Sequence, residues 1–185
     1  MAVLAEALSV IVRRDSIDRK YRGGWSAFVA SVPNSTFCTD GEIARVGFMD
    51  PRDVESFIGR LQTAGLSFLE NGKAIDLAVA DQQDGLTTEC EWLEFGRLPF
   101  GEHGKVAACW LFEGPRVGAG MHMRGTKMHL VTPGNWSFEG SLSQHYTFVP
   151  KDELTKRLQF LRREDSTDVY LDLATGREVY IGRVK

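Results

Sequence analysis

Cysteine and histidine are scarce in this chain. Its 185 residues include four histidines and three cysteines, Cys38, Cys90 and Cys109. The cysteines are odd in number, widely spaced and form no CxxC pair, which argues against a disulfide framework and against a zinc knuckle. We therefore expect free thiols in a reducing compartment, and we expect neither a metal nor another cofactor.

Long apolar runs and an excess of positive charge are also missing. No apolar run approaches the ~20 residues that cross a membrane. Residues 1–12 lack a basic leader and a convincing cleavage site, so we interpret them as a strand that enters the fold. The formal net charge of −3 gives no general electrostatic reason to bind nucleic acid or an anionic membrane. These absences favour a cytoplasmic protein that binds neither.

The clearest local pattern that is present lies between residues 45 and 81. A short strand is followed by Asp50, which suits a helix N-cap, and by Pro51, which suits the first helical turn. Gly65 is placed to end that helix, and Asn71-Gly72 favours a tight hairpin turn. Four apolar residues share one face of the predicted helix, namely Val54, Phe57, Ile58 and Leu61.

Segments upstream complete an N-terminal unit. Residues 8–13 are rich in β-branched side chains and predict a strand, and residues 15–32 predict two short helices or one broken helix. Trp25 lies in the apolar stripe of that region, which favours a core anchor over a ligand platform. A second hairpin is predicted at Asp40-Gly41. Over residues 1–85 the order is βαββαβ, which indicates a ferredoxin-like fold with an antiparallel sheet and its helices on one face.

The second half, residues 86–185, is predicted to be richer in strands. It should contain one helix at about 151–163 and end in a hairpin, and we expect both halves to pack as one compact α+β domain. Its last part repeats the strand, helix and hairpin order of residues 45–81; a duplication and the independent recurrence of a common unit both explain this. The strands expected in this half cover residues 92–98, 105–112, 127–131 and 145–149, after a polar loop at 82–91.

A glycine-rich loop at residues 114–129 is the most tempting place for chemistry. It comes close to a phosphate-binding loop, but Thr126 and Lys127 stand in the wrong order, and a strand is predicted where a helix should begin. The histidines form no pair with metal-ligand spacing. From this region we take Arg124 and Lys127 as candidates for ligand binding, and His122, His129 and His145 as candidates for catalysis.

Cys38 and Asp40 are two further catalytic candidates. Cys38 precedes a hairpin turn and would be a nucleophile if a histidine approached it, although its apolar neighbours favour a place in the core. Carboxylates also gather at Glu89, Glu91 and Glu94. They are typical either of an acid–base pair, of a site for a cationic partner or of a polar strand face, and the polar face is the reading we favour.

No nucleophile, base and orienting group can be assembled from these spacings. We therefore expect a non-catalytic module that uses an exposed sheet surface or an edge strand to bind a protein partner, another copy of itself or a small effector. The alternative is a small-molecule enzyme with its site at the His122/His129 loop, between the two halves. A third hypothesis, RNA binding on the sheet, needs two exposed aromatic residues and a basic rim, and the sequence does not indicate them.

Overall fold

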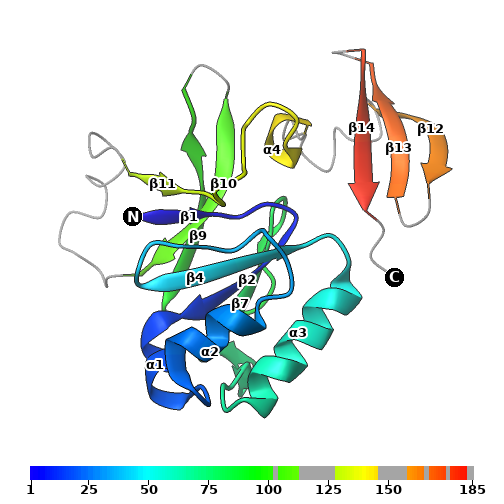
Figure 1. Ribbon diagram of the computed structural model, residues 1–185. Coiled ribbons are helices and arrows are strands. Elements are labelled where there is room, and N and C mark those ends of the chain that lie inside the picture. Colours follow the sequence, from blue (N-terminus) through cyan, green and yellow to red (C-terminus); the bar gives the residue numbers. More distant parts are fainter. Residues whose placement is uncertain (102–103, 113–127, 146–157, 165–166, 174–175, 183–185) are drawn as a thin grey trace. The chain divides into compact units, whose positions relative to one another are not determined.

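The structure of this protein is a computed structural model (Figure 1). It is mixed α+β, mostly strands with few helices, and this confirms the predicted class. By internal contacts the chain divides into two units, residues 1–136 and 137–185. The predicted boundary near residue 85 and the predicted packing as one domain stay predictions. The residues that the structure describes are 1–101, 104–112, 128–145, 158–164, 167–173 and 176–182.

An antiparallel five-stranded sheet and a small two-stranded sheet belong to the N-terminal unit. Their strands are β2 (Leu8–Arg13), β3 (Cys38–Thr39), β4 (Ile43–Phe48), β5 (Leu69–Glu70), β6 (Lys73–Ala74), β7 (Leu77–Asp81) and β8 (Gly85–Leu86). The larger sheet has the order β3-β4-β2-β7-β8, and the smaller one pairs β5 with β6. Both hairpins predicted from turn residues, at Asp40-Gly41 and Asn71-Gly72, are confirmed.

Three helices cover one face of the five-stranded sheet (Figure 1): α1 (Arg14–Lys20), α2 (Gly24–Ser31) and α3 (Pro51–Thr63). The predicted start of α3 is confirmed, because Asp50 Oδ1 accepts a hydrogen bond from the Arg52 N–H at 2.9 Å. The predicted apolar face of α3 is also confirmed, since all four of its residues are buried: Val54, Phe57, Ile58 and Leu61. Burying one such apolar side chain stabilises a fold by about 1.5–3 kcal/mol.

A second, four-stranded sheet covers the opposite face of the first. It consists of β1 (Ala2–Leu4), β9 (Leu93–Pro99), β10 (Lys105–Leu111) and β11 (Leu130–Val131), in the order β11-β1-β10-β9. Within it β1 is antiparallel to β10 and parallel to β11. Residues such as Val3 and Cys109 share a core with Ile11 and Ala78 of the five-stranded sheet. The N-terminal unit therefore has three layers: helices, a sheet and a second sheet.

The C-terminal unit is described in part. It contains the short helix α4 (Leu142–His145) and a sheet formed by β12 (Leu158–Glu164), β13 (Thr167–Asp172) and β14 (Arg177–Gly182). This sheet is antiparallel in the order β12-β13-β14. The pairing of β13 with β14 confirms the hairpin predicted near the end of the chain.

The helix predicted at 151–163 is wrong over its second part. Residues 158–163 belong to β12, and residues 151–157 lie outside the described residues. Leu158 and Leu161 match a helical spacing, but Phe160 stands between them and lies opposite Tyr170 of β13. Pairing along the whole of β13 outweighs a short helical pattern, because periodicity over so few apolar residues suits both structures.

Three smaller expectations also change. The predicted strand at 145–149 is wrong at its first residue, because His145 ends α4, and the remainder lies outside the described residues. The predicted loop at 82–91 contains β8, which pairs with β7. After the turn at Asn71-Gly72 we expected one continuous strand over residues 73–81, but the structure has two, β6 and β7, separated by Ile75 and by Asp76, which accepts hydrogen bonds from Lys20.

Candidate functional site

Cys38, a predicted catalytic candidate, is a buried residue of β3. Its Sγ–H donates to the carbonyl of Val131 at 3.8 Å, and the sulfur accepts a hydrogen bond from the Leu4 N–H. Burial raises the pKa of the Cys38 thiol to about 11. At neutral pH the group is therefore a protonated thiol, whereas nucleophilic attack requires the thiolate.

Asp40 forms the turn of its hairpin. Its Oδ1 accepts hydrogen bonds from the N–H groups of Glu42 and Ile43, both at 2.9 Å. Gly41, which lies between Asp40 and Glu42, has a φ of 96°, and a glycine adopts this angle without a steric cost. These contacts give the carboxylate a structural use in the chain reversal.

Most of the other predicted site residues lie outside the described part of the chain. This applies to His122, Arg124 and Lys127, and the side chain of His145 is likewise not described. His129 is exposed, and its carbonyl accepts a hydrogen bond from the Ala2 N–H at 3.0 Å. His129 directly precedes β11, the strand that Cys38 contacts. Convergence of the histidines on Cys38 stays a prediction.

The acidic cluster is occupied by contacts within the chain. Lys73 Nζ lies 3.0 Å from Glu89 Oε1 and 2.5 Å from Glu91 Oε1, and these carboxylates raise the pKa of Lys73. Glu94 Oε2 accepts a hydrogen bond from Trp110 Nε1 at 2.5 Å. The three carboxylates are thus tied to a cation or an indole, which fits the polar strand face rather than a pair of acid–base catalysts.

Trp25 is partly buried and packs against Phe28 and Arg14. Phe28 stacks on one side with ring centroids 5.6 Å apart, and the guanidinium carbon of Arg14 lies 3.9 Å from the centroid of Trp25. Arg14 is itself held by Asp18 at 2.8 Å. Trp25 therefore joins α1 to α2 and to the core, as the sequence predicted.

A buried guanidinium, which the sequence analysis missed, lies between the two sheets. Arg45 of β4 is only 3% exposed. Its Nε donates to Ser9 Oγ at 3.0 Å, and its terminal nitrogens donate to the carbonyls of Thr36 at 3.0 Å and Glu6 at 2.7 Å. Burial lowers the pKa of Arg45, but the group stays charged because its ordinary pKa lies above about 12. No carboxylate among the described residues lies within ion-pair distance of it.

The sequence does contain a signal for this guanidinium. Along Ile43-Ala44-Arg45-Val46-Gly47 the side chains alternate, so Arg45 shares a face with Ile43 and Gly47. Both faces of β4 are buried, which leaves no route to solvent. A Cβ at Gly47 would overlap the guanidinium group of Arg45. A lone arginine in an apolar strand, followed two residues later by glycine, is the pattern that predicts this arrangement.

All three cysteines gather at the core that contains this guanidinium. Cys38 and Cys109 are part of the core between the sheets, and Cys90 packs against it. Burial raises the pKa of Cys109 to about 12, and the charge of Arg45 opposes this shift. All three thiols are free. Among the described residues, no group of three or more His, Cys, Asp or Glu side chains is placed to hold a metal ion.

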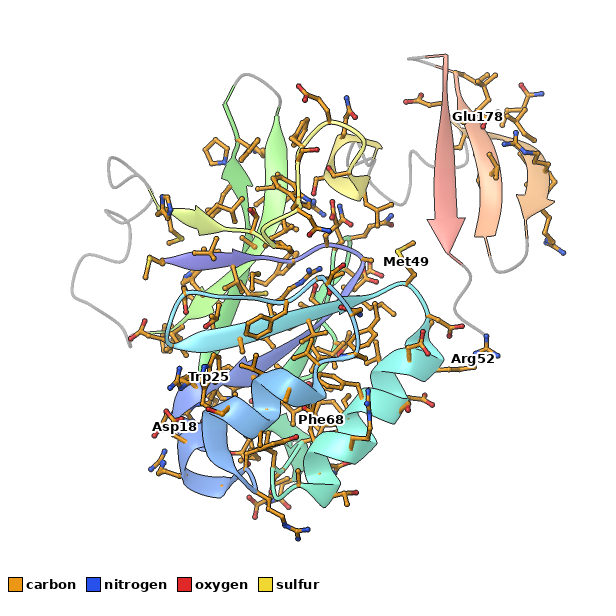
Figure 2. The ribbon with its side chains drawn as sticks, in the orientation of Figure 1. Asp18, Trp25, Met49, Arg52, Phe68 and Glu178 are labelled. Carbon is orange, nitrogen blue, oxygen red and sulfur yellow. The ribbon has the colours of Figure 1, made fainter. Side chains whose placement is uncertain are left out.

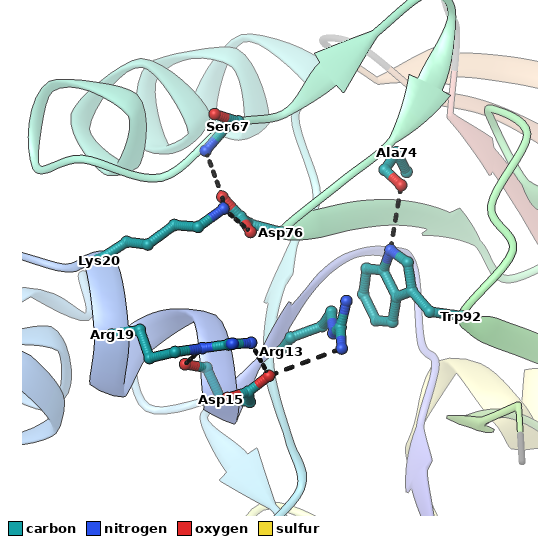
Figure 3. Close-up of polar contacts among 8 residues, drawn as sticks. All are labelled: Arg13, Asp15, Arg19, Lys20, Ser67, Ala74, Asp76 and Trp92. Atoms are coloured by element: carbon teal, nitrogen blue, oxygen red, sulfur yellow. Dashed lines mark hydrogen bonds and ion pairs between the residues drawn. The ribbon is translucent and has the colours of Figure 1, made fainter.

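A second buried charge is the carboxylate of Asp76, which directly precedes β7 and contacts Lys20 and Ser67 (Figure 3). Its side chain is 2% exposed and accepts two hydrogen bonds from Lys20 Nζ, at 2.8 and 3.0 Å, and one from the Ser67 N–H at 2.8 Å. Burial raises the pKa of Asp76, but the hydrogen bonds from Lys20, Ser67 and Ser16 outweigh it, so the pKa lies below its ordinary value. This site ties α1 to the turn between β6 and β7.

The C-terminal sheet exposes apolar side chains. Phe160 is 50% exposed, and its ring meets Tyr170 edge-to-face, with centroids 5.5 Å apart and planes at 76°. Leu161 and Leu173 are 41% and 58% exposed. On the same sheet Arg162 donates to both carboxylate oxygens of Glu178, at 2.7 and 2.9 Å. Glu178 is labelled in Figure 2. We call Phe160, Leu161, Tyr170 and Leu173 the C-terminal apolar set.

Comparisons with known proteins add no relative. No protein family matches this chain, and no curated protein and no solved structure shows significant similarity to it. Within the described residues, none of the helices is both long and apolar enough to cross a membrane. Any statement about function therefore has to be argued from the side chains themselves.

Proposed function

We propose that this protein is a non-catalytic binding module and that its partner is another polypeptide. The observation that carries the proposal is the C-terminal apolar set, headed by the half-exposed ring of Phe160. Phe160 and Tyr170 lie opposite each other in the pairing of β12 with β13, so these two rings share one face of the sheet. Aromatic and large aliphatic side chains that remain exposed in this way are typical of protein interfaces.

Two features support a polypeptide over the other ligand classes. The rings of Phe160 and Tyr170 meet edge-on, so they do not form the parallel platform on which nucleic-acid bases stack. Arg162 is engaged by Glu178, which takes a cation away from a phosphate backbone. The candidate catalytic groups also have other uses, since Cys38 is protonated and Asp40 forms a turn.

The test is site-specific photocrosslinking of the full chain in its native host cell. A benzophenone amino acid replaces Phe160 in one variant and the neighbouring exposed Gln159, whose side chain points to the other side of the strand, in the control. We expect a covalent adduct of one defined mass at position 160 and none at 159. An adduct of doubled mass identifies a second copy as the partner. No adduct at either position, or equal adducts at both, contradicts the proposal.

We further propose a ferredoxin-like topology for the βαββαβ segment. The order β3-β4-β2-β7 with antiparallel neighbours, and the burial of α1, α2 and α3 against one face, support this reading. A cytoplasmic location is proposed as well, supported by three free thiols. Circular dichroism and hydrogen exchange of the isolated segment would test whether it folds as a unit of that type.

A further inference from the structure

Strand β1 is held by strands that lie far from it in the sequence. Val3 is opposite Cys109 of β10 on one side and Val131 of β11 on the other. All three residues of β1 have no exposed surface. In the described chain only the link Ala5-Glu6-Ala7 joins this strand to β2, which belongs to the other sheet. The strand is thus a separate element on a short connection.

The link contains a strained residue. Ala7 has a φ of 52°, in the left-handed region. A residue with a Cβ rarely adopts this conformation, because the Cβ crowds the following carbonyl oxygen. The conformation arises where the chain turns from the four-stranded sheet into the five-stranded sheet. An extended link would return Ala7 to the β region and release the strain.

Buried polar groups hold the link in its closed form. The carbonyl of Glu6 accepts hydrogen bonds from Arg45 at 2.7 Å and from Ser9 Oγ at 3.1 Å. Gln82 pairs with both backbone groups of Ala7, each at 2.9 Å. These bonds and the charge of Glu6 oppose opening, but no carboxylate of the described chain lies at ion-pair distance from the desolvated Arg45, which would regain water if the link opened. In the closed form of the link Ala7 is therefore strained, and burial of the charge of Arg45 costs solvation free energy.

We propose that β1 is an exchangeable strand. Two copies of this chain form a dimer in which the β1 of each copy lies between the β10 and β11 of the other, and the link Ala5-Glu6-Ala7 is extended. Every contact of β1 is retained, because the receiving strands are identical, and only the link differs between monomer and dimer. The partner is a second copy of the chain, and the contact does not involve the C-terminal apolar set.

A disulfide trap distinguishes the two forms. Val3→Cys places a second thiol opposite Cys109, and paired residues of this kind lie about 5.5 Å apart between Cα atoms, within the range of a disulfide. Cys38→Ala and Cys90→Ala remove the other thiols. The full chain is refolded at a high and at a low concentration and oxidised with copper phenanthroline and air, which accept the two electrons. Non-reducing electrophoresis then reports which chains are joined.

At high concentration we expect a covalent dimer, and at low concentration an internally linked monomer. A monomeric product at every concentration overturns the proposal. A variant with Val3→Cys and Cys109→Ala controls for linkage that does not depend on this pair.

Two substitutions at the link give an independent test in the chain with its natural cysteines. Ala7→Gly removes the strain of the closed link, so we expect the dimer fraction to fall about tenfold. Ala7→Val increases the strain and should raise that fraction. Light scattering coupled to size exclusion measures both, with circular dichroism to confirm folding. Phe160→Ser should leave the fraction unchanged, which separates this dimer from any contact through the C-terminal apolar set. Equal dimer fractions for the glycine and valine variants contradict the proposal.

Discussion

Arg45 and Asp76 are charged side chains with 3% and 2% exposed surface, and their surroundings differ. Arg45 is surrounded by neutral acceptors, two carbonyls and one hydroxyl. Asp76 accepts from an ammonium group and a backbone N–H. The carboxylate has a counter-ion in Lys20, which is 42% exposed, whereas no ion-pair partner of the guanidinium lies in the described part of the chain.

Arg45 and Asp76 have different structural roles. Asp76 and Lys20 form a pair at the rim of the unit, where water screens part of the interaction, so the pair contributes modestly to stability. Arg45 lies between two sheets and donates to carbonyls of two separate segments, the β1–β2 link and the turn before β3. A buried cation with no carboxylate of the described chain at ion-pair distance is costly, and the hydrogen bonds of Arg45 indicate that its role is to position these segments.

Removing each charge is the strongest test of this contrast. Arg45→Ala leaves a cavity and deprives two carbonyls of their donor, so we expect the free energy of unfolding to fall by about 4 kcal/mol. Asp76→Ala leaves one N–H unsatisfied, while Lys20 turns to solvent, and should cost about 2 kcal/mol. Urea denaturation of both variants measures the difference. Equal losses would show that both charges act in the same way.

Crowding the guanidinium without removing it should have a smaller effect. Gly47→Ala places a methyl group on Arg45, and we expect a loss of about 2–3 kcal/mol. Gly59→Ala is the matched control, since its Cβ meets nothing within 4 Å in the interior of α3 and should stabilise the protein by about 0.5–1 kcal/mol. Thermal unfolding compares the two variants, and a neutral Gly47→Ala would mean that Arg45 moves aside freely.

Because the thiols beside Arg45 have raised pKa values, we expect the protein to lose stability at alkaline pH. The folded pKa is about 11 for Cys38 and about 12 for Cys109, against about 8.5 for a free thiol. Because folding raises both pKa values, the two thiols contribute fully to the free energy of unfolding below pH ~8.5. They lose this contribution as the pH rises toward the folded pKa values. At pH 10 each thiol should account for about 2 kcal/mol. In Cys109→Ala the decrease between pH 7 and 10 should be smaller, as followed by urea midpoints.

Asp76 predicts a weaker change at acid pH. Its folded pKa is lowered, so its contribution is present above the unfolded value of about 3.9 and is lost as the pH falls through the folded value. Asp76→Asn should reduce the stability difference between pH 3 and pH 7, as followed by urea midpoints at both pH values. Gln62→Asn on α3 serves as a control for amide substitutions. If the free energy of unfolding of Asp76→Asn falls with pH as in the natural protein, Asp76 does not cause the loss of stability in acid.

Local chemistry explains which elements the sequence could predict. The N-cap at Asp50, the four buried residues of α3 and the turns at Asp40-Gly41 and Asn71-Gly72 depend on residues a few positions apart, and all are confirmed. The short helical pattern at 158–163 failed because β13 decides the structure of that segment. That pairing is close in the sequence, but a few apolar residues at helical spacing suit a strand equally well and do not indicate it.

The site was harder to predict than the fold because its residues come from segments far apart in the sequence. Arg45 has its donors satisfied by Ser9, Thr36 and Glu6, and these partners come from three different segments. Cys38, Cys90 and Cys109 are far apart in the sequence and meet at one core only because two sheets stack. A sequence pattern identifies the unusual residue, but the neighbours that give it a role are supplied by tertiary structure.

The position of β1 also sets an order for folding on the ribosome. Its partners β10 and β11 are synthesised about 100 residues after it, and chain synthesis proceeds at roughly 5–20 residues per second. The segment therefore leaves the ribosome several seconds before its final neighbours exist. During that interval the apolar residues of β1 lack the two strands that bury them in the folded protein.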